Sequence, residues 1–208
     1  MLVGEYRDFA FDESRAPQNR GLWRQEIFKT DANCPLDLEI GTGNGFHFGH
    51  YASKNKDRCL VGIELKFKPL IQSIRRPLRV GLKNARIVRF DAKEIEKLFA
   101  DQELNNVMIH FPDPWELGPQ WKHRLISDEF LKKIHSIQRS GSFVEFKTDS
   151  ANYFRWTLER FVRSEYQIEC VTTHLHQSRL VQGNFVTAFE DIFMRKGLRI
   201  HYIKVIKN

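Results

Sequence analysis

Short apolar runs alternate with amphipathic stretches along the chain from Pro35 onward. Apolar runs of about four to eight residues are typical of strands, and apolar positions three or four apart are typical of helices. We therefore expect seven strands, at residues 36–40, 59–64, 86–90, 106–111, 142–147, 168–173 and 198–206. Helices are expected between them, at 46–53, from Pro69 to a kink or end at Pro77, and at 95–99, 130–137 and 152–161.

This alternation of strand and helix predicts an α/β fold of the Rossmann-like, doubly wound kind. The sheet is expected to be mostly parallel, and its last two strands should pair as an antiparallel edge. Residues 1–33 are polar and irregular, so we expect an N-terminal arm with a short helix around 23–28. Residues 34–208 are expected to form a single domain.

Composition places the chain among globular proteins with a real core. It has 208 residues, of which 41% are hydrophobic and 12% aromatic. No apolar run approaches the roughly 20 residues that span a bilayer, and the N-terminus lacks the apolar region of a secretory signal. Cys34, Cys59 and Cys170 are odd in number and far apart, without a CxxC motif. We therefore expect a cytoplasmic protein with reduced thiols and no membrane partner.

The charge is unevenly distributed and positive overall. Lys and Arg number 33 against 26 Asp and Glu, which gives a net charge of +7. Excess positive charge favours a polyanionic partner, although a generally basic surface gives the same net charge. Residues 65–90 contain eight basic residues and no acidic one, and should form a positive patch: Lys66, Lys68, Arg75, Arg76, Arg79, Lys83, Arg86 and Arg89.

A glycine-rich turn follows the first expected strand. Gly41, Gly43 and Gly45 occupy alternate positions, which lets the backbone turn sharply and approach a ligand closely. The spacing differs from the GxGxxG of dinucleotide binders, whose third glycine serves a pyrophosphate. Glu39 stands two residues before Gly41 and suits a cationic methionine group better than an anionic pyrophosphate.

Acidic residues also end the next two expected strands. Glu64 is placed to accept hydrogen bonds from a ribose diol, and Asp91-Ala92 is placed to accept from an adenine amino group. Each acid alone is more often a solvated strand-end residue. Together they lie at the edge where open α/β sheets bind ligands, so we expect S-adenosylmethionine there.

The fourth expected strand leads into Phe111-Pro112-Asp113-Pro114-Trp115. Two prolines fix φ on either side of Asp113 and hold this residue rigidly. A rigid turn with a capping Asp explains the prolines but not the neighbouring Trp115. An Asp can accept from the Watson–Crick edge of guanine, and an aromatic ring can stack on the base.

These motifs together resemble the bacterial tRNA (guanine-N7-)-methyltransferases. Further matches, in order from about Leu36 to the end, are Lys122-His123-Arg124, Thr148-Asp149 and Thr187-Ala188-Phe189-Glu190. The resemblance implies a class I S-adenosylmethionine-dependent methyltransferase that modifies N7 of a guanine in the tRNA variable loop.

The resemblance also implies roles for individual residues. Residues that match Glu39, Glu64, Asp91 and Asp113 are associated with the cofactor, and Asp113 with catalysis as well. The cofactor set is expected to include the glycine turn and Ala92. Asp149 and the stretch from Thr187 to Glu190 are expected to contact the substrate. We expect substrate contacts also from Trp115, Lys122 and Arg124.

The chain departs from the family's pattern directly after Trp115. The family commonly has a His-Lys pair here, whereas this chain has Glu116-Leu117, followed by Gly118-Pro119-Gln120-Trp121. The substrate-contacting lysine is therefore replaced by Leu117, and Lys122 or Arg124 is the candidate for its charge. Two alternatives stay open at this point: a methyltransferase for another RNA or a small molecule, and a catalytically silent RNA-binding subunit.

Other candidate chemistry is weaker. His47 and His50, and His174 and His176, have spacings compatible with metal ligands but no clear third ligand. Methyl transfer to N7 needs no metal, so none is expected. We also expect no DNA partner and no obligatory protein partner.

Overall fold

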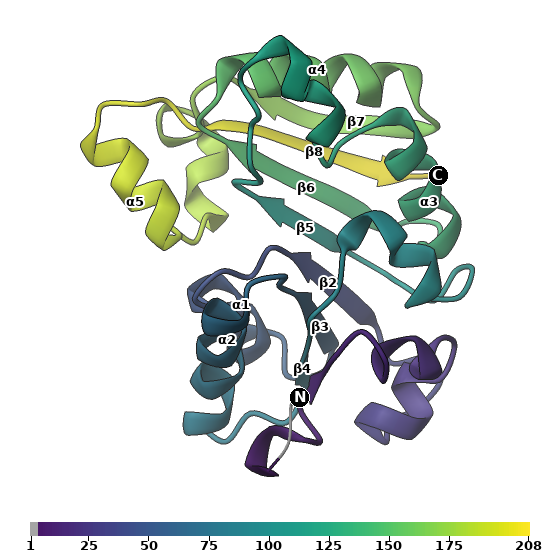
Figure 1. Cartoon of the computed structure of the whole chain (residues 1–208). Helices are drawn as coiled ribbons and strands as arrows, with labels where there is room; N and C mark the ends of the chain where they lie inside the picture. Colours follow the sequence, from purple (N-terminus) through teal and green to yellow (C-terminus); the bar gives the residue numbers. More distant parts are fainter. Residues whose placement is uncertain (1–3) are drawn as a thin grey trace. The chain divides into compact units, whose positions relative to one another are not determined.

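The computed structural model describes residues 4–208, which comprise two compact α/β units (Figure 1). Unit 1 contains the residues up to Val107 together with Ser136–Arg139, and unit 2 contains Met108–His135 and Ser140–Asn208. The first three residues of the expected arm lie outside the described residues. Between residues 4 and 208, no helix is long and apolar enough to cross a membrane.

Unit 1 is a parallel arrangement of four strands in the order β1-β4-β3-β2. The strands are β1 (Ala10–Phe11), β2 (Leu36–Ile40), β3 (Cys59–Ile63) and β4 (Ala85–Val88). The helices α1 (Phe46–Lys54) and α2 (Phe67–Arg79) lie on one side of them. Shorter helical segments are Gly4–Tyr6, Ala16–Asn19, Trp23–Phe28 and Ala92–Lys97.

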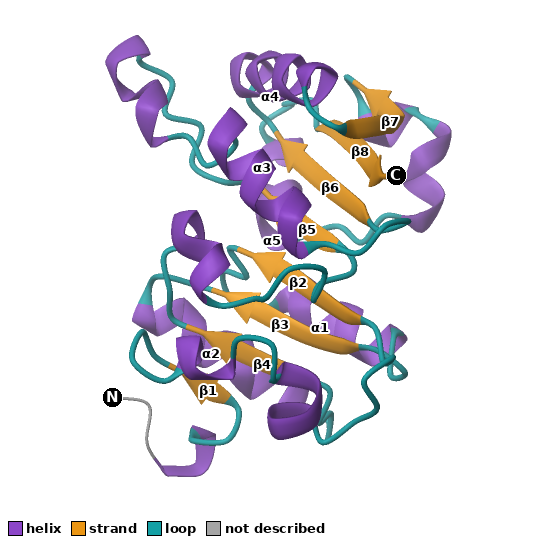
Figure 2. Ribbon diagram, turned by 90° about the vertical axis from the view of Figure 1, so that its right-hand side faces the viewer, coloured by secondary structure: helices purple, strands orange, loops and turns teal. Residues whose placement is uncertain are grey.

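Unit 2 carries the antiparallel edge that the sequence predicts (Figure 2). Its strand order is β5-β6-β8-β7, and β8 pairs antiparallel with both of its neighbours. These strands are β5 (Val107–His110), β6 (Phe143–Thr148), β7 (Tyr166–Thr172) and β8 (His201–Lys207). The helices are α3 (Asp128–Ile137), α4 (Ala151–Arg163) and α5 (Ala188–Arg195), with short helices at Gly118–His123, Leu175–Gln177 and Arg179–Gly183.

The structure has eight strands in the described residues rather than the seven expected. The additional strand, β1, lies in the expected arm and pairs with β4, where Ala10 is opposite Ile87. The predicted helix around 23–28 is confirmed, and its Trp23 is fully buried, with Nε1 donating to the carbonyl of Leu98 at 2.8 Å. The expected arm therefore contributes Ala10, Phe11 and Trp23 to the core of unit 1.

Two helix boundaries differ from the expected ones for identifiable reasons. Helix α2 begins two residues before Pro69 and continues past Pro77 to Arg79, because Pro77 lacks only its own N–H and its carbonyl still accepts from the N–H of Val80. Helix α5 was not expected at all. Its sequence signal is the capping box in which Thr187 accepts from the backbone of Glu190 and Glu190 accepts in return.

A buried polar ladder joins β2 to α1. All five residues of β2 are buried, including Asp37 and Glu39, so the alternation of apolar and acidic residues does not mark a solvent face. Asp37 accepts from Tyr51 at 2.8 Å and from Arg58 at 2.5 and 2.6 Å, and Glu39 pairs with His47 Nδ1 at 2.7 Å. Each buried carboxylate therefore has a partner, as buried charge requires.

Close packing around Gly62 keeps the centre of unit 1 tight. A Cβ at this position would lie 2.6 Å from Thr42 Cγ2 and 2.7 Å from side-chain atoms of Ile87 and Phe48. These neighbours come from the glycine turn, from β4 and from α1, so they cannot all retreat. Only glycine fits here.

We predict that Gly62→Ala lowers the free energy of unfolding by ~1–3 kcal/mol, because the added methyl overpacks a filled core. Urea denaturation followed by circular dichroism measures the change. Gly118→Ala is the matched control, since its Cβ would meet no heavy atom within 4 Å, and it should change stability by less than about 0.5 kcal/mol. Equal effects of the two substitutions would contradict the packing argument.

Candidate functional site

The glycine turn between β2 and α1 has the backbone conformation that its sequence predicts. Gly41, Gly43 and Gly45 have φ values of 77°, 54° and 76°, in the left-handed region that favours glycine. A Cβ at Gly45 would lie 2.4 Å from the Cα of Ser73 on α2, whereas a Cβ at Gly41 would meet no heavy atom within 4 Å. Gly45 thus allows close packing of helices, and Gly41 leaves its backbone open to a ligand.

Glu64 lies directly after β3 and holds the same turn. Its Oε2 accepts from the backbone N–H of Gly43 at 2.9 Å, and its Oε1 accepts from the backbone N–H of Lys66 at 2.9 Å. A carboxylate offers about four lone-pair positions, so two acceptor positions remain for other donors. The structure therefore brings Glu64 to the glycine turn, as a ribose-binding role needs.

The other acids of unit 1 have different surroundings. Glu39 is buried and hydrogen-bonded to His47, which the spacing argument considered only as a metal ligand. Asp91 is exposed and caps the short helix that begins at buried Ala92, because its Oδ1 accepts from the N–H of Lys93 at 2.9 Å. Glu39 is thus held from inside the protein, while Asp91 faces solvent.

The loop after β5 places Asp113 at the surface of unit 2. Phe111 and Trp115 have φ values of 51° and 44°, which are rare for bulky residues and cost conformational energy. Asp113 between them is exposed, and none of the described residues donates a hydrogen bond to its carboxylate. Trp115 is partly exposed, and its ring centre is 5.2 Å from that of His123. The carboxylate is therefore held rigidly without using its own acceptors.

Arg124, expected to contact substrate, is instead buried behind this loop. It is 1% exposed, and its Nε donates to the carbonyl of Pro114 at 2.8 Å. Its guanidinium lies about 5 Å from the ring centres of Trp121, Tyr153 and Trp156. Burial lowers the pKa of Arg124. This placement favours a supporting role, in which an aromatic cage holds a cation against the backbone of the loop.

The segment that departs from the family's pattern contributes to this support. Trp121 supplies one wall of the cage, and its Nε1 donates to the carbonyl of Glu116 at 3.3 Å. The Glu116 carboxylate accepts from the hydroxyl of Ser150. Leu117 is 66% exposed and Lys122 is exposed, so Lys122 is the accessible cation of this segment.

The expected substrate residues near the C-terminus form a buried network. Glu190 is 0% exposed and binds His176 at 2.8 Å, Asn184 at 2.6 Å and Lys147 at 3.4 Å. Thr187 caps α5 with its side chain. Lys147 was not singled out in the sequence analysis. Its sequence signal is only that a charged residue stands at the end of an expected strand. The network fixes the loop before α5. Because the Glu190 side chain is enclosed, a substrate cannot contact it directly in this conformation.

Asp149, the remaining expected substrate residue, lies half-buried after β6. Burial raises the pKa of this carboxyl, and the neighbouring charge of Glu116 raises it further. His174 and His176, like His47 and His50, belong to no group of three or more potential metal ligands among the described residues.

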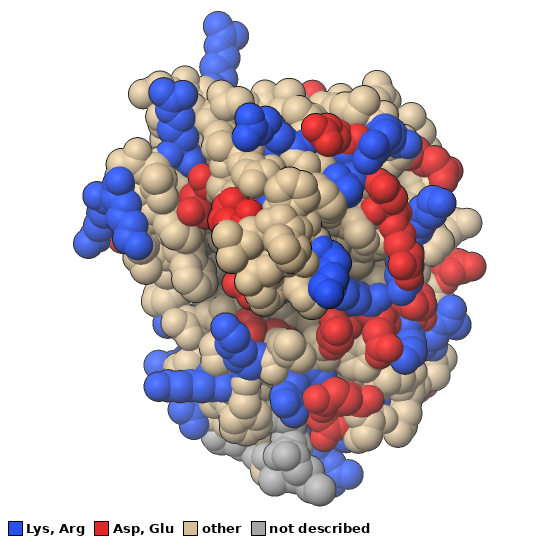
Figure 3. Space-filling model, turned by 45° about the horizontal axis from the view of Figure 1, so that its top comes forward, with Lys and Arg blue, Asp and Glu red and all other residues tan. Residues whose placement is uncertain are grey.

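The basic segment 65–90 is only partly available as a positive surface. Arg86 is buried between the rings of Phe9 and Phe28, at 4.7 and 4.9 Å, so it does not contribute to a patch. Arg89 forms an ion pair with Glu13 at 3.1 Å. Figure 3 shows Lys and Arg side chains in several separate groups on the face it presents, with acidic side chains between them. The exposed cations of the segment are Lys66, Lys68, Arg79 and Lys83.

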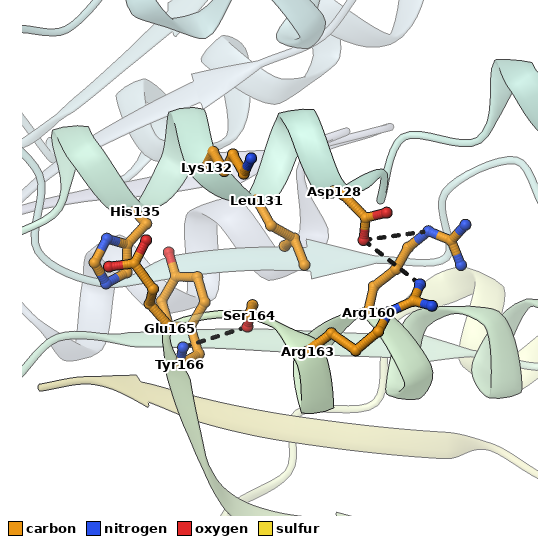
Figure 4. A pocket seen from close by; sticks show the side chains of 9 residues that line it. All are labelled: Asp128, Leu131, Lys132, His135, Arg160, Arg163, Ser164, Glu165 and Tyr166. Carbon is orange, nitrogen blue, oxygen red and sulfur yellow. Dashed lines mark hydrogen bonds and ion pairs between the residues drawn. The ribbon is translucent and has the colours of Figure 1, made fainter.

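A cavity of about 290 Å³ lies between α3 and α4 of unit 2 (Figure 4). Its lining includes Arg160 and Arg163, whose guanidinium nitrogens are 3.9 and 3.7 Å from Asp128 Oδ1. Burial lowers the pKa of His135 at its other end. The lining has three basic residues, Lys132, Arg160 and Arg163, against Asp128 and Glu165, so the cavity offers only a small net positive charge to an anionic ligand.

Known proteins resemble this chain over nearly its whole length. A family model described as "Putative methyltransferase" matches residues 33–203. A tRNA (guanine-N(7)-)-methyltransferase of Bdellovibrio bacteriovorus is 51% identical over 206 residues, which cover 99% of each chain. The chain belongs to the tRNA (guanine-N7-)-methyltransferase family. A member from Lachnoclostridium phytofermentans is 34% identical, over 88% of this chain and 85% of that protein.

Solved structures agree with this family at the level of the fold. The 16S rRNA methyltransferase KamB has a TM-score of 0.61 at 15% identity, covering 84% of this chain and 88% of that one. A SAM-dependent methyltransferase from Aquifex aeolicus has a TM-score of 0.57 at 12% identity, covering 84% and 82%. This member of the tRNA (guanine-N7-)-methyltransferase family is thus an S-adenosylmethionine-dependent enzyme with the Rossmann-like class I fold.

The residues of unit 1 fit this cofactor. Gly41 leaves open space where a side chain would stand, and Glu64 keeps two acceptor positions, which we propose for the ribose hydroxyls. We propose the buried Glu39 as the negative charge for a cationic amino group. In this family member, Gly43, Gly45, Asp91 and Ala92 complete the proposed binding set.

We predict that Glu64→Ala weakens S-adenosylmethionine binding at least tenfold, because charge-assisted hydrogen bonds contribute about 1.5–3 kcal/mol each. Isothermal titration calorimetry measures the affinity, and circular dichroism reports whether the fold is kept. Glu64→Gln retains one acceptor oxygen and should lose less affinity. Glu26→Ala removes an exposed acid of the same unit and should have no effect. Unchanged affinity in Glu64→Ala would remove Glu64 from the site.

Proposed function

We propose that this chain transfers a methyl group from S-adenosylmethionine to N7 of a guanine in the variable loop of tRNA. The observation that carries the proposal is the exposed, rigidly held Asp113, whose carboxylate receives no hydrogen bond from the described residues. The names of the relatives support tRNA as the substrate. The cytoplasm is the compartment we propose for the reaction.

The chemistry of N7 asks for positioning more than for proton transfer. Guanine N7 carries an in-plane lone pair and no proton, so the protein needs no general base. When bound, S-adenosylmethionine supplies a methyl group on a sulfonium, which is a good leaving group. Most of the catalysis can therefore come from alignment of the reacting atoms.

The chain's residues divide this work. Asp113 accepts from the N–H groups on the Watson–Crick edge of guanine, and Trp115 offers a ring face for stacking. Arg124 holds Asp113 indirectly through the carbonyl of Pro114. Lys122 and the exposed cations of the basic segment 65–90 are proposed to bind phosphates of the RNA backbone. Asp149, Thr187 and Glu190 are proposed to form part of the substrate-binding surface. Thr187 and Glu190 would do so indirectly, because their buried network fixes the loop before α5.

The direct test is nucleoside mass spectrometry of bulk tRNA incubated with the protein and S-adenosylmethionine. We expect 7-methylguanosine to increase, and nuclease mapping to place it in the variable loop. Methylation of another RNA or of a small molecule alone would establish the alternative enzyme. The absence of both cofactor binding and methyl transfer would contradict the proposal and favour a catalytically silent RNA-binding subunit.

We predict that Asp113→Asn slows methyl transfer roughly 30- to 1,000-fold, because one acceptor becomes a donor that faces guanine's own donors. Single-turnover kinetics with saturating cofactor measure the rate. Cofactor affinity should fall less than the rate, since Glu39, Glu64 and Asp91 remain. Glu129→Gln, an exposed acid of the same unit, is the control.

A tRNA with inosine at the target distinguishes an orienting role from other roles of Asp113. Inosine lacks the exocyclic amino group, so it should react slowly with the unmodified enzyme and show a smaller penalty on Asp113→Asn. Equal penalties on guanine and inosine would show that Asp113 does not contact that amino group. Full activity of Asp113→Asn on guanine would defeat the assignment altogether.

A further inference from the structure

Two of the three cysteines are close neighbours in unit 1, although 25 residues separate them in sequence. The Sγ atoms of Cys34 and Cys59 are 3.5 Å apart, and both are free thiols. Cys34 lies two residues before the start of β2, and Cys59 begins β3, opposite Leu36 in the strand register. A disulfide between them would therefore join two neighbouring strands with only a small movement.

Both thiols are reached from solvent through one cavity. The cavity has a volume of about 490 Å³ and is lined by Cys34 and Cys59 together with the exposed Lys56 and Lys83. Arg58 also lines it but is engaged by Asp37. The exposed Asp57 also lines the cavity, so its exposed charged side chains are two cations and one anion, which favours an anionic molecule over a neutral one.

Buried positive charge surrounds the pair from the other side. Arg24 is buried and donates to the carbonyl of Cys34 at 2.6 Å, and Arg86 is buried nearby. Both cations oppose the effect of burial on Cys59. An electropositive, partly accessible setting with a second thiol at hand is the arrangement typical of redox-active cysteines.

We propose that Cys34 and Cys59 form a reversible disulfide by exchange with an anionic low-molecular-weight disulfide such as glutathione disulfide. In the first step the Cys34 thiolate attacks one sulfur of that molecule, whose S–S bond breaks and releases one thiol. In the second step Cys59 gives up its proton and attacks Cys34 Sγ, which releases the second thiol. The protein loses two electrons and two protons, and the small disulfide gains both.

The two cysteines have different parts in this exchange. Cys34 is partly exposed, while Cys59 is only 4% exposed. Burial raises the pKa of Cys59 to about 12, and the hydrogen bond with Cys34 contributes. Cys34 is therefore the accessible, attacking sulfur and Cys59 the resolving one.

The test incubates the full chain with glutathione disulfide and a metal chelator, then counts free thiols and maps peptides by mass spectrometry. We expect the loss of two of the three thiols and a linked pair of peptides that contain Cys34 and Cys59. Cys59→Ser should accumulate glutathione on Cys34, whereas Cys34→Ser should leave Cys59 unmodified. Cys170→Ser should not alter the cross-link.

The attraction of an anionic reagent by Lys56 and Lys83 is tested separately. Replacing Lys56 and Lys83 by Glu should slow the reaction with glutathione disulfide several-fold but not that with uncharged hydroxyethyl disulfide. Retention of all three thiols in the unmodified protein, or a cross-link that involves Cys170, would overturn the proposal. Equal slowing with both reagents would overturn the role of the lysines in attracting the reagent.

Discussion

The polar ladder between β2 and α1 is the interaction on which unit 1 depends. Asp37 and Glu39 are two residues apart on a strand and so lie on one face, about 6.6 Å apart along its axis. Their partners Tyr51 and His47 are four residues apart on a helix, about 6 Å along its axis, so the two spacings match. These two hydrogen-bonded pairs, Glu39–His47 and Asp37–Tyr51, fix both the position and the direction of α1 against β2. The glycine turn must then close the short gap between them in one defined shape.

This constraint explains why the binding edge of unit 1 is built before any ligand arrives. Glu64 can reach the N–H of Gly43 because the turn has one shape, and Gly62 can pack against Thr42 and Phe48 for the same reason. Burying a carboxylate is costly unless it is paired, so loss of His47 would leave the Glu39 charge unsatisfied beside the site, whereas Asp37 would keep Arg58 if Tyr51 were lost. The same bonds that hold the helix therefore also orient Glu39.

The sequence predicted most strands and the acids at their ends, because buried parallel strands are short apolar runs and strand ends are defined by glycine and proline. It could not predict which polar residues are buried. Arg124 and Glu190 were expected at the substrate, since a charged residue is exposed by default. The structure encloses the first in a cage of aromatic rings and the second among three side-chain donors. Such partners lie far apart in the chain, so no local pattern reveals them.

In unit 2, the carboxylate that presents chemistry is separate from the groups that hold it. Asp113 is exposed, while Arg124 donates to the backbone of its loop and Glu190 accepts from side chains of the buried network. A reaction that moved a proton would need a titrating group at the reacting atoms, and its environment would have to tune that group's pKa. Methylation at an unprotonated ring nitrogen has no such requirement. A site for this reaction can therefore use its buried charges for rigidity, and the left-handed φ values of Phe111 and Trp115 are where that rigidity is concentrated.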